Sequence, residues 1–101
     1  MSLRTACDVL HRGVCLDLRY RGEFVCVEVH AAGYGPDAEP LIYCWQRVGL
    51  TGGGWRLINL IEAEAVDDSG YFSDAPRPGY QLDGAISEIV CQVQDGKPVS
   101  L

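Results

Sequence analysis

One stretch of the chain places a cysteine, a carboxylate and a histidine at alternate positions, and these residue types can build a nucleophile and its base. They are Cys26, Glu28 and His30. Alternate residues of a strand point in parallel, whereas a nucleophile and a base must converge on one reacting atom. We therefore interpret the three as a half-exposed strand face, and we expect a protein that is not an enzyme.

Two further patterns suggest phosphate or cation chemistry but lack the partners it needs. The glycines at 52–54 are followed by Trp55, without the lysine and hydroxyl of a phosphate-binding loop, so they predict a flexible hairpin loop. With no C-x-x-C and with its two histidines on different elements, the sequence predicts no metal site and no cofactor. A run of acids is interpreted as a solvated face; it comprises Glu62, Glu64, Asp67 and Asp68.

Arginines and aromatic residues form the most suggestive set. Of the eight cations seven are arginine, which suits planar contact with phosphate or carboxylate and stacking on rings. Arginine with aromatics on a small sheet is a common way to hold bases and nucleotides. We expect a face that binds a small anionic or nucleotide-like ligand. The alternative is that the aromatic residues belong to the hydrophobic core and that the arginines lie at its rim, where they keep the protein soluble. The set comprises Arg19, Arg21, Tyr43, Trp45, Arg47, Trp55 and Arg56.

The charge balance limits the partners. The chain has 101 residues, with 8 basic against 14 acidic residues and a net charge of −6, which excludes a strongly basic nucleic-acid clamp. Residues 1–60 are balanced, with six arginines and six acids, whereas residues 61–101 hold two cations against eight acids. This asymmetry argues against a long nucleic acid as partner and leaves a small anion on the first part of the chain as an option.

Composition and cysteine spacing predict one domain over residues 1–101, with a core at about 14–80 and an acidic C-terminal segment at 61–101. No apolar run approaches the roughly 20 residues that span a bilayer, and no signal peptide is apparent, so we expect a cytoplasmic protein without membrane contact. The five cysteines are odd in number and widely spaced, so we expect them to be small buried hydrophobes rather than disulfides.

The elements that must position these residues begin with a helix and a hairpin. Apolar residues at helical spacing predict a short amphipathic helix over about residues 1–10 that ends at Gly13. Residues 14–20 and 23–30 alternate with period two around Arg21-Gly22 and predict a two-residue hairpin. The expected pairs are Tyr20–Glu23, Leu18–Val25, Leu16–Val27 and Val14–Val29.

The rest of the chain predicts further short strands and turns. Residues 41–48 are expected to form a strand covered on both faces in the middle of the sheet, and residues 55–60 the returning strand. Residues 85–93 fit a helix or a strand, with the β-branched content favouring a strand. The turn-rich stretches are a loop at 31–40, a flexible connection at 49–54, a short strand or turn at 63–66 and a polar crossing at 67–79. Together these elements predict a mostly β fold, a small SH3-like barrel or strongly bent antiparallel sheet of five to six strands with a short N-terminal helix.

The order of these features over residues 14–80 resembles the WYL domain. The motifs are L-x-L-R-Y-R-G and V-x-V-E-V-H, then PLIYCWQ, GWRLINLIEA and APRPGY. The resemblance implies an SH3-like barrel that senses nucleic acid or nucleotide-like ligands, in a family usually found in bacterial transcriptional regulators. The Trp-Tyr-Leu tripeptide is absent, and Asn59, Ile61 and Glu62 stand where the family has Arg, Asp and Arg.

These observations favour a regulatory, ligand-sensing module without enzymatic activity. The alternative is a structural or protein-interaction domain that associates with itself, as a homodimer for example, and has no ligand site.

Overall fold

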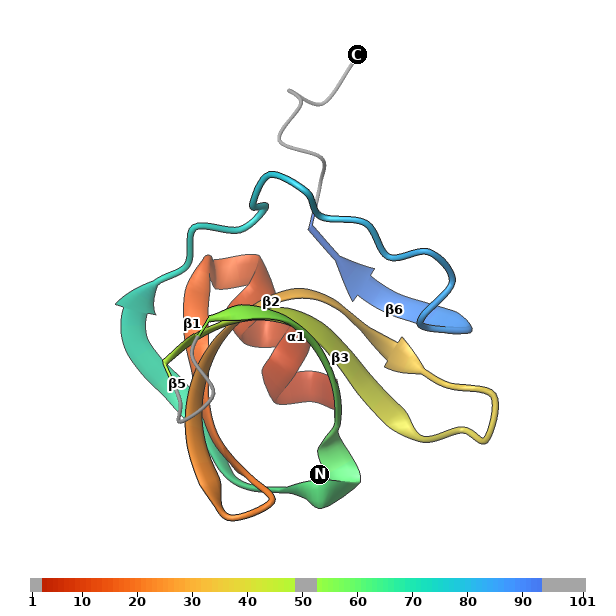
Figure 1. The fold of residues 1–101 in the computed structure, drawn as a ribbon, viewed down its shortest axis with the longest axis horizontal. Coiled ribbons are helices and arrows are strands. Elements are labelled where there is room, and N and C mark those ends of the chain that lie inside the picture. Colours follow the sequence, from red (N-terminus) through yellow and green to blue (C-terminus); the bar gives the residue numbers. More distant parts are fainter. Residues whose placement is uncertain (1–2, 49–52, 94–101) are drawn as a thin grey trace.

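The computed structural model describes residues 3–48 and 53–93 (Figure 1). Within these residues the strands form one antiparallel sheet in the order β4-β3-β2-β1-β5, with β6 paired to β2 beside that path. The sheet is strongly bent and is not closed, which confirms the predicted fold class. The elements are α1 (Leu3–Arg12), β1 (Val14–Tyr20), β2 (Glu23–Tyr34), β3 (Pro40–Val48), β4 (Gly54–Asn59), the short 3-10 helix η1 (Leu60–Glu62), β5 (Ala63–Phe72) and β6 (Glu88–Gln92).

Helix α1 packs against the concave side of the bent sheet, which we call the inner face. Leu3, Ala6 and Val9 lie at helical spacing and are buried with the apolar side chains of that face. The helix ends at Gly13, whose φ of 70° suits glycine and whose N–H donates to the carbonyl of Leu10 at 3.2 Å. In the described part of the chain, no helix is long and apolar enough to cross a membrane.

The β1–β2 hairpin has the predicted register for three of its four pairs, from Tyr20–Glu23 to Leu16–Val27. Arg21 and Gly22 both have positive φ, as a two-residue type I′ turn requires. The fourth predicted pair, Val14–Val29, is wrong, because the β1–β2 ladder ends at Leu16–Val27. On its other edge, Val14 pairs with Phe72 of β5.

Strand β2 is the central strand of the sheet, a place that the sequence suggested for β3. It pairs with β1 through residues 23–27, exchanges β1 for β6 at residues 31–34, and keeps β3 on its other edge. The predicted loop at 31–40 is therefore reduced to 35–39. Small buried residues make this exchange possible, since a Cβ at Gly33 would collide with the backbone of Glu88.

After β4, strand β5 is longer than the short strand or turn predicted at 63–66, and the polar crossing predicted from residue 67 is shorter. The strand predicted within residues 85–93 is confirmed. Strand β5 extends to Phe72 because the free edge of β1 offers it a partner, so the polar crossing begins only at residue 73. The ambiguous stretch at 85–93 contains strand β6, as its β-branched content suggested. Of the flexible connection predicted at 49–54, residues 49–52 lie outside the described residues, and Gly54 already belongs to β4.

A disulfide joins Cys7 of α1 to Cys91 of β6, which corrects the prediction that all five cysteines are unpaired small hydrophobes. The two residues are 84 positions apart, and their Cα atoms lie 5.9 Å apart because β6 pairs with the part of β2 that α1 covers. Cys15, Cys26 and Cys44 are free thiols. The bond therefore ties the beginning of the described chain to its end.

We expect Cys7→Ser and Cys91→Ser each to lower the free energy of unfolding by about 4 to 5 kcal/mol, the loop-closure entropy for a separation of 84 residues. Denaturant unfolding with and without dithiothreitol measures this. Dithiothreitol should lower the free energy of unfolding of the wild type to that of the two variants and should not change that of the variants. Cys26→Ser, which keeps the disulfide, should lose stability in dithiothreitol as the wild type does. Equal stability of the oxidised and reduced wild type would contradict the expectation.

Candidate functional site

The predicted arginine and aromatic set divides between the two faces of the sheet. On β3 and β4, Cys44 and Ile58 point to the inner face and are fully buried, so Arg56 points inward as well, while the residues between them point to the opposite, outer face. Alternation along each strand thus separates Arg56 from Trp55 although the two are neighbours in sequence.

The three predicted aromatics do come together on the outer face. Tyr43 stacks on Trp55 with ring centroids 5.3 Å apart, and Trp45 meets Trp55 edge to face at 5.2 Å. Tyr80 packs over Trp55 at 5.9 Å from a segment that crosses this face. We call that segment, residues 73–80, the strap. It covers the aromatic group, so these rings form a satellite packing cluster.

Three of the four predicted arginines lie elsewhere. Arg19 stands over the ring of exposed Phe24, 4.9 Å from its centroid. Arg21 pairs with Glu62 at 2.9 Å in the hairpin turn. On the inner face, Arg56 donates to the side chain of Gln46, lies 3.8 Å from Glu23 and rests over the ring of Tyr20.

Arg47 points to the outer face beside Cys15 and Glu28, polar residues of β1 and β2. It is the extra residue of a β-bulge, because Cys26 pairs with Val48 and Val27 pairs with Gln46. Its Nη1 donates to the carbonyl of Phe72 at 2.7 Å and to the thiol of Cys15 at 3.1 Å. The guanidinium thereby links β3, β1 and the end of β5.

A buried ion-pair network centred on Glu28 holds the strap in place. Glu28 has no exposed surface, and Arg77 binds both of its carboxylate oxygens. Arg47 approaches the same carboxylate at 3.5 Å, and the backbone N–H of Asp74 donates to it at 3.1 Å. Burial alone would raise the pKa of Glu28, but these hydrogen bonds and positive charges outweigh it and lower the pKa. Glu28 is thus an ionised anchor.

His30 completes the network on the same strand. Its Nε2 accepts the backbone N–H of Arg77 at 3.0 Å, so the ring proton is on Nδ1, which donates to the carbonyl of Glu28 at 2.9 Å. Burial lowers the pKa of His30, and the positive charge of Arg77 adds to this, against the opposing effect of Glu28. The expected half-exposed face is therefore fully covered at Glu28 and His30, because the strap lies on these two residues, while Cys26 is half-buried.

Acids from the second half of the chain pair with arginines from the first half. Asp68 binds Arg12 at 2.7 Å, and Asp74 lies 4.0 Å from Arg47. With the pair between Arg21 and Glu62, these contacts show that the balanced and the acidic segments are mixed in space. Residues 1–60 and 61–101 therefore differ in net charge along the sequence, but in the described part of the fold their charged side chains are not separated into two regions.

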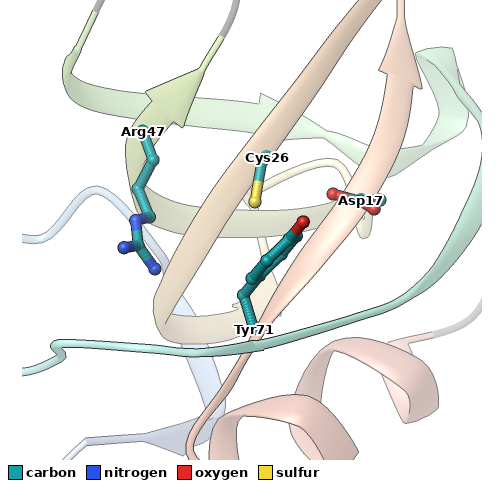
Figure 2. A pocket seen from close by; sticks show the side chains of 4 residues that line it. All are labelled: Asp17, Cys26, Arg47 and Tyr71. Atoms are coloured by element: carbon teal, nitrogen blue, oxygen red, sulfur yellow. The ribbon is translucent and has the colours of Figure 1, made fainter.

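A pocket of about 410 Å³ lies on the outer face, lined by Asp17, Cys26, Arg47 and Tyr71 (Figure 2). Asp17 and Cys26 are a cross-strand pair, so two of its lining side chains stand next to each other on β1 and β2. Figure 2 shows Arg47 on one side of Cys26 and Asp17 on the other, with Tyr71 rising from β5 toward the space between Cys26 and Asp17. Of the predicted site residues, the pocket contains Arg47 alone.

The position of Tyr71 depends on a second irregularity, in β5. Val14 pairs with Phe72 and Leu16 pairs with Asp68, so residues 69–71 stand opposite Cys15 alone. Asp68 accepts the N–H of Gly70 at 2.7 Å, and Gly70 has a φ of 80°, which glycine adopts without strain. Sequence reasoning placed Tyr71 in an unstructured crossing; the tyrosine and phenylalanine side by side between acids and glycine were the available signal.

The chemistry of the pocket favours binding over catalysis. Burial, together with the neighbouring Cys15 and Asp17, raises the pKa of Cys26 to about 12, so it is a thiol at neutral pH and a poor nucleophile. Both ring nitrogens of His30 are engaged and Glu28 is ion-paired, so neither can take a proton from a ligand. Among the described residues, no group of three or more His, Cys, Asp or Glu side chains is arranged to hold a metal ion.

Comparison of the chain with protein-family models, with curated proteins and with solved structures finds no match.

We expect acid to destabilise the protein through His30. Because the folded pKa of His30 lies below the usual 6.5, the unfolded chain takes up a proton first, and stability present above pH 6.5 is lost as the pH falls toward the folded pKa. The loss should approach about 1.4 kcal/mol per pH unit. Glu28, whose pKa is also lowered, adds a further loss as the pH falls below 4.5.

Urea unfolding at pH 7.5, 6.5 and 5.5 measures this loss. His30→Gln keeps an acceptor for the N–H of Arg77 and should abolish the dependence between pH 6.5 and 5.5. His11→Gln, at the exposed end of α1, is the matched control and should retain it. A wild type whose stability is flat over this interval would count against the assignment.

Proposed function

We propose that the protein is a regulatory, ligand-binding module without enzymatic activity, and that it binds a small molecule with an anionic group in the pocket beside Arg47. The observation that carries the proposal is the pocket itself, a hollow of about 410 Å³ with a guanidinium on one wall and a tyrosine ring on another. The WYL-like relationship remains part of the proposal on the sequence motifs alone.

The geometry narrows the ligand face that the sequence suggested. Arg47 retains the role proposed for the whole set, because its guanidinium lines the pocket and, among the described residues, its Nη2 lies as far as 4.0 Å from the carboxylate of Asp74. The strap covers the aromatic cluster that the sequence suggested as the stacking surface for a ligand. We therefore assign the aromatic contact with the ligand to Tyr71, which is 68% exposed. A ring system such as a nucleobase could lie on Tyr71, whereas a long nucleic acid would meet arginines already paired with acids.

Exposed apolar side chains on open strand edges favour a second candidate function, self-association. Strands β4 and β5 end the sheet path, and Phe72 on β5 is 81% exposed. An unpaired edge with apolar side chains is a template for pairing with another chain. Light scattering coupled to size exclusion tests this: a dimer that Phe72→Asp converts to monomer supports it, and a monomer at high concentration opposes it.

A cytoplasmic location remains part of the proposal on sequence grounds, and one observation opposes it. Disulfides persist mainly in oxidising compartments, and the chain contains one between Cys7 and Cys91.

We expect a ligand of this pocket, at ten times its Kd, to raise the melting temperature by roughly 5 to 10 °C, since it binds only the folded state. A thermal-shift panel of nucleoside monophosphates, carboxylates and amino acids measures this. Tyr71→Ala should remove the shift because it deletes one wall of the pocket. Phe72→Ala is the matched control, an exposed neighbour that does not line the pocket, and should retain it.

Arg56→Ala separates this site from the face predicted from the sequence. Because Arg56 points to the inner face, the variant should keep the ligand shift. A shift lost in Arg56→Ala and kept in Tyr71→Ala would overturn the assignment to this pocket, and the absence of any shift across the panel would overturn the proposed function.

A further inference from the structure

We infer that the pocket takes a zwitterion of amino-acid size, with its carboxylate against Arg47 and its ammonium group against Asp17. This inference rests on the proposed function and names its ligand class. It follows from the placement of the two charges, from the balance of charge around them and from the surface between them.

The two charged residues stand on opposite sides of the pocket. Asp17 belongs to β1 and Arg47 to β3, with Cys26 of β2 between them (Figure 2). Neighbouring strands lie about 4.8 Å apart, so the two backbones are separated by about 10 Å. Side chains that reach inward from both sides leave a span suited to a ligand with charges of opposite sign at its two ends.

The balance of charge disfavours a ligand that is only anionic. Arg47 already lies near the carboxylates of Glu28 and Asp74, and Asp17 adds a further negative charge to the pocket. A phosphate monoester with nearly two negative charges would gain one partly neutralised guanidinium and be repelled by Asp17. A zwitterion converts that repulsion into an ion pair, and its net charge of zero matches the compensated surroundings.

The surface between the charges suits the uncharged body of such a ligand. Cys26 presents a neutral thiol between them, and Tyr71 presents its ring from β5. An ammonium group near Asp17 would also lie close to the aromatic ring of Tyr71, where a cation is attracted to the ring face. Each lining side chain thus has one role: two supply the charged ends, and two supply the surface between them.

Two matched ligand series test the inference by NMR titration of the amide signals of Asp17 and Cys26. The first compares L-phenylalanine with 3-phenylpropanoate, which lacks the ammonium group, and with phenethylamine, which lacks the carboxylate. The second compares L-leucine with 4-methylpentanoate and 3-methylbutylamine. In the wild type, at least one amino acid should bind roughly tenfold more tightly than either of its analogues.

Asp17→Asn should remove that preference over the carboxylate analogue and leave binding of the analogue unchanged or stronger. The substitution is nearly isosteric and lies on an exposed side chain, so the fold should persist. Asp37→Asn, in the turn between β2 and β3, makes the same charge change outside the pocket and should behave like the wild type.

The outcomes separate this inference from the proposed function. If the carboxylate analogues bind as tightly as the amino acids, and Tyr71→Ala abolishes that binding, the pocket takes simple anions and only the zwitterion is wrong. If neither amino acid shifts the amide signals of the pocket while another compound of the thermal-shift panel binds there, the ligand class is again wrong. If nothing binds in the pocket, both are wrong.

Discussion

The structure of the outer face depends on one buried carboxylate. Glu28 has no exposed surface, yet it is ionised because Arg77 donates to it from the strap and the guanidinium of Arg47 on β3 lies 3.5 Å away. Removing one partner of a buried ion pair typically costs about 3 to 5 kcal/mol, because a charge is left without compensation. Glu28 is therefore the point at which the strap, the aromatic cluster and the pocket are fastened to the sheet.

The remaining features follow from this anchor. Arg77 lies over the ring of Trp45 at 5.0 Å because its guanidinium is held by Glu28, and Tyr80 follows it onto Trp55. Arg47 is held by the same carboxylate and in turn binds the carbonyl of Phe72, which fixes the end of β5 next to Tyr71. The pocket thus lies beside the part of the outer face that the strap covers, and the carboxylate of Glu28 helps to hold Arg47, one of its lining residues, in place.

The sequence predicted what local patterns determine. Period-two alternation specified the β1–β2 hairpin because a one-residue slip would have moved its whole apolar set to the other face. The extent of β5 was not predictable, since its acids and Gly70 form a bulge only when the edge of β1 is available. Nor were the pairs of Glu28 with Arg77 and of Cys7 with Cys91 predictable, because they join residues 49 and 84 positions apart and leave no periodic signal.

The candidate site shows the same limit. The predicted strand at 41–48 and its returning strand at 55–60 suggested that the aromatic residues of β3 and β4 lie together, as they do, but the sequence did not indicate that the strap covers them. Strand alternation could have separated Arg56 from Trp55 in advance. The bulge that turns Arg47 toward Cys26 could not have been predicted, since it depends on the pairing of β3 with β2 rather than on the residue types.

Native-state hydrogen exchange of the strap tests the central role of Glu28 most directly. The N–H of Asp74 is bound to Glu28 and that of Arg77 to His30, so both amides should exchange slowly in the wild type, like those of the central strand. In Glu28→Gln they should lose most of this protection while the amides of the β1–β2 hairpin keep theirs. Fast exchange of both strap amides in the wild type, or unchanged protection in the variant, would contradict the view that Glu28 fastens the strap.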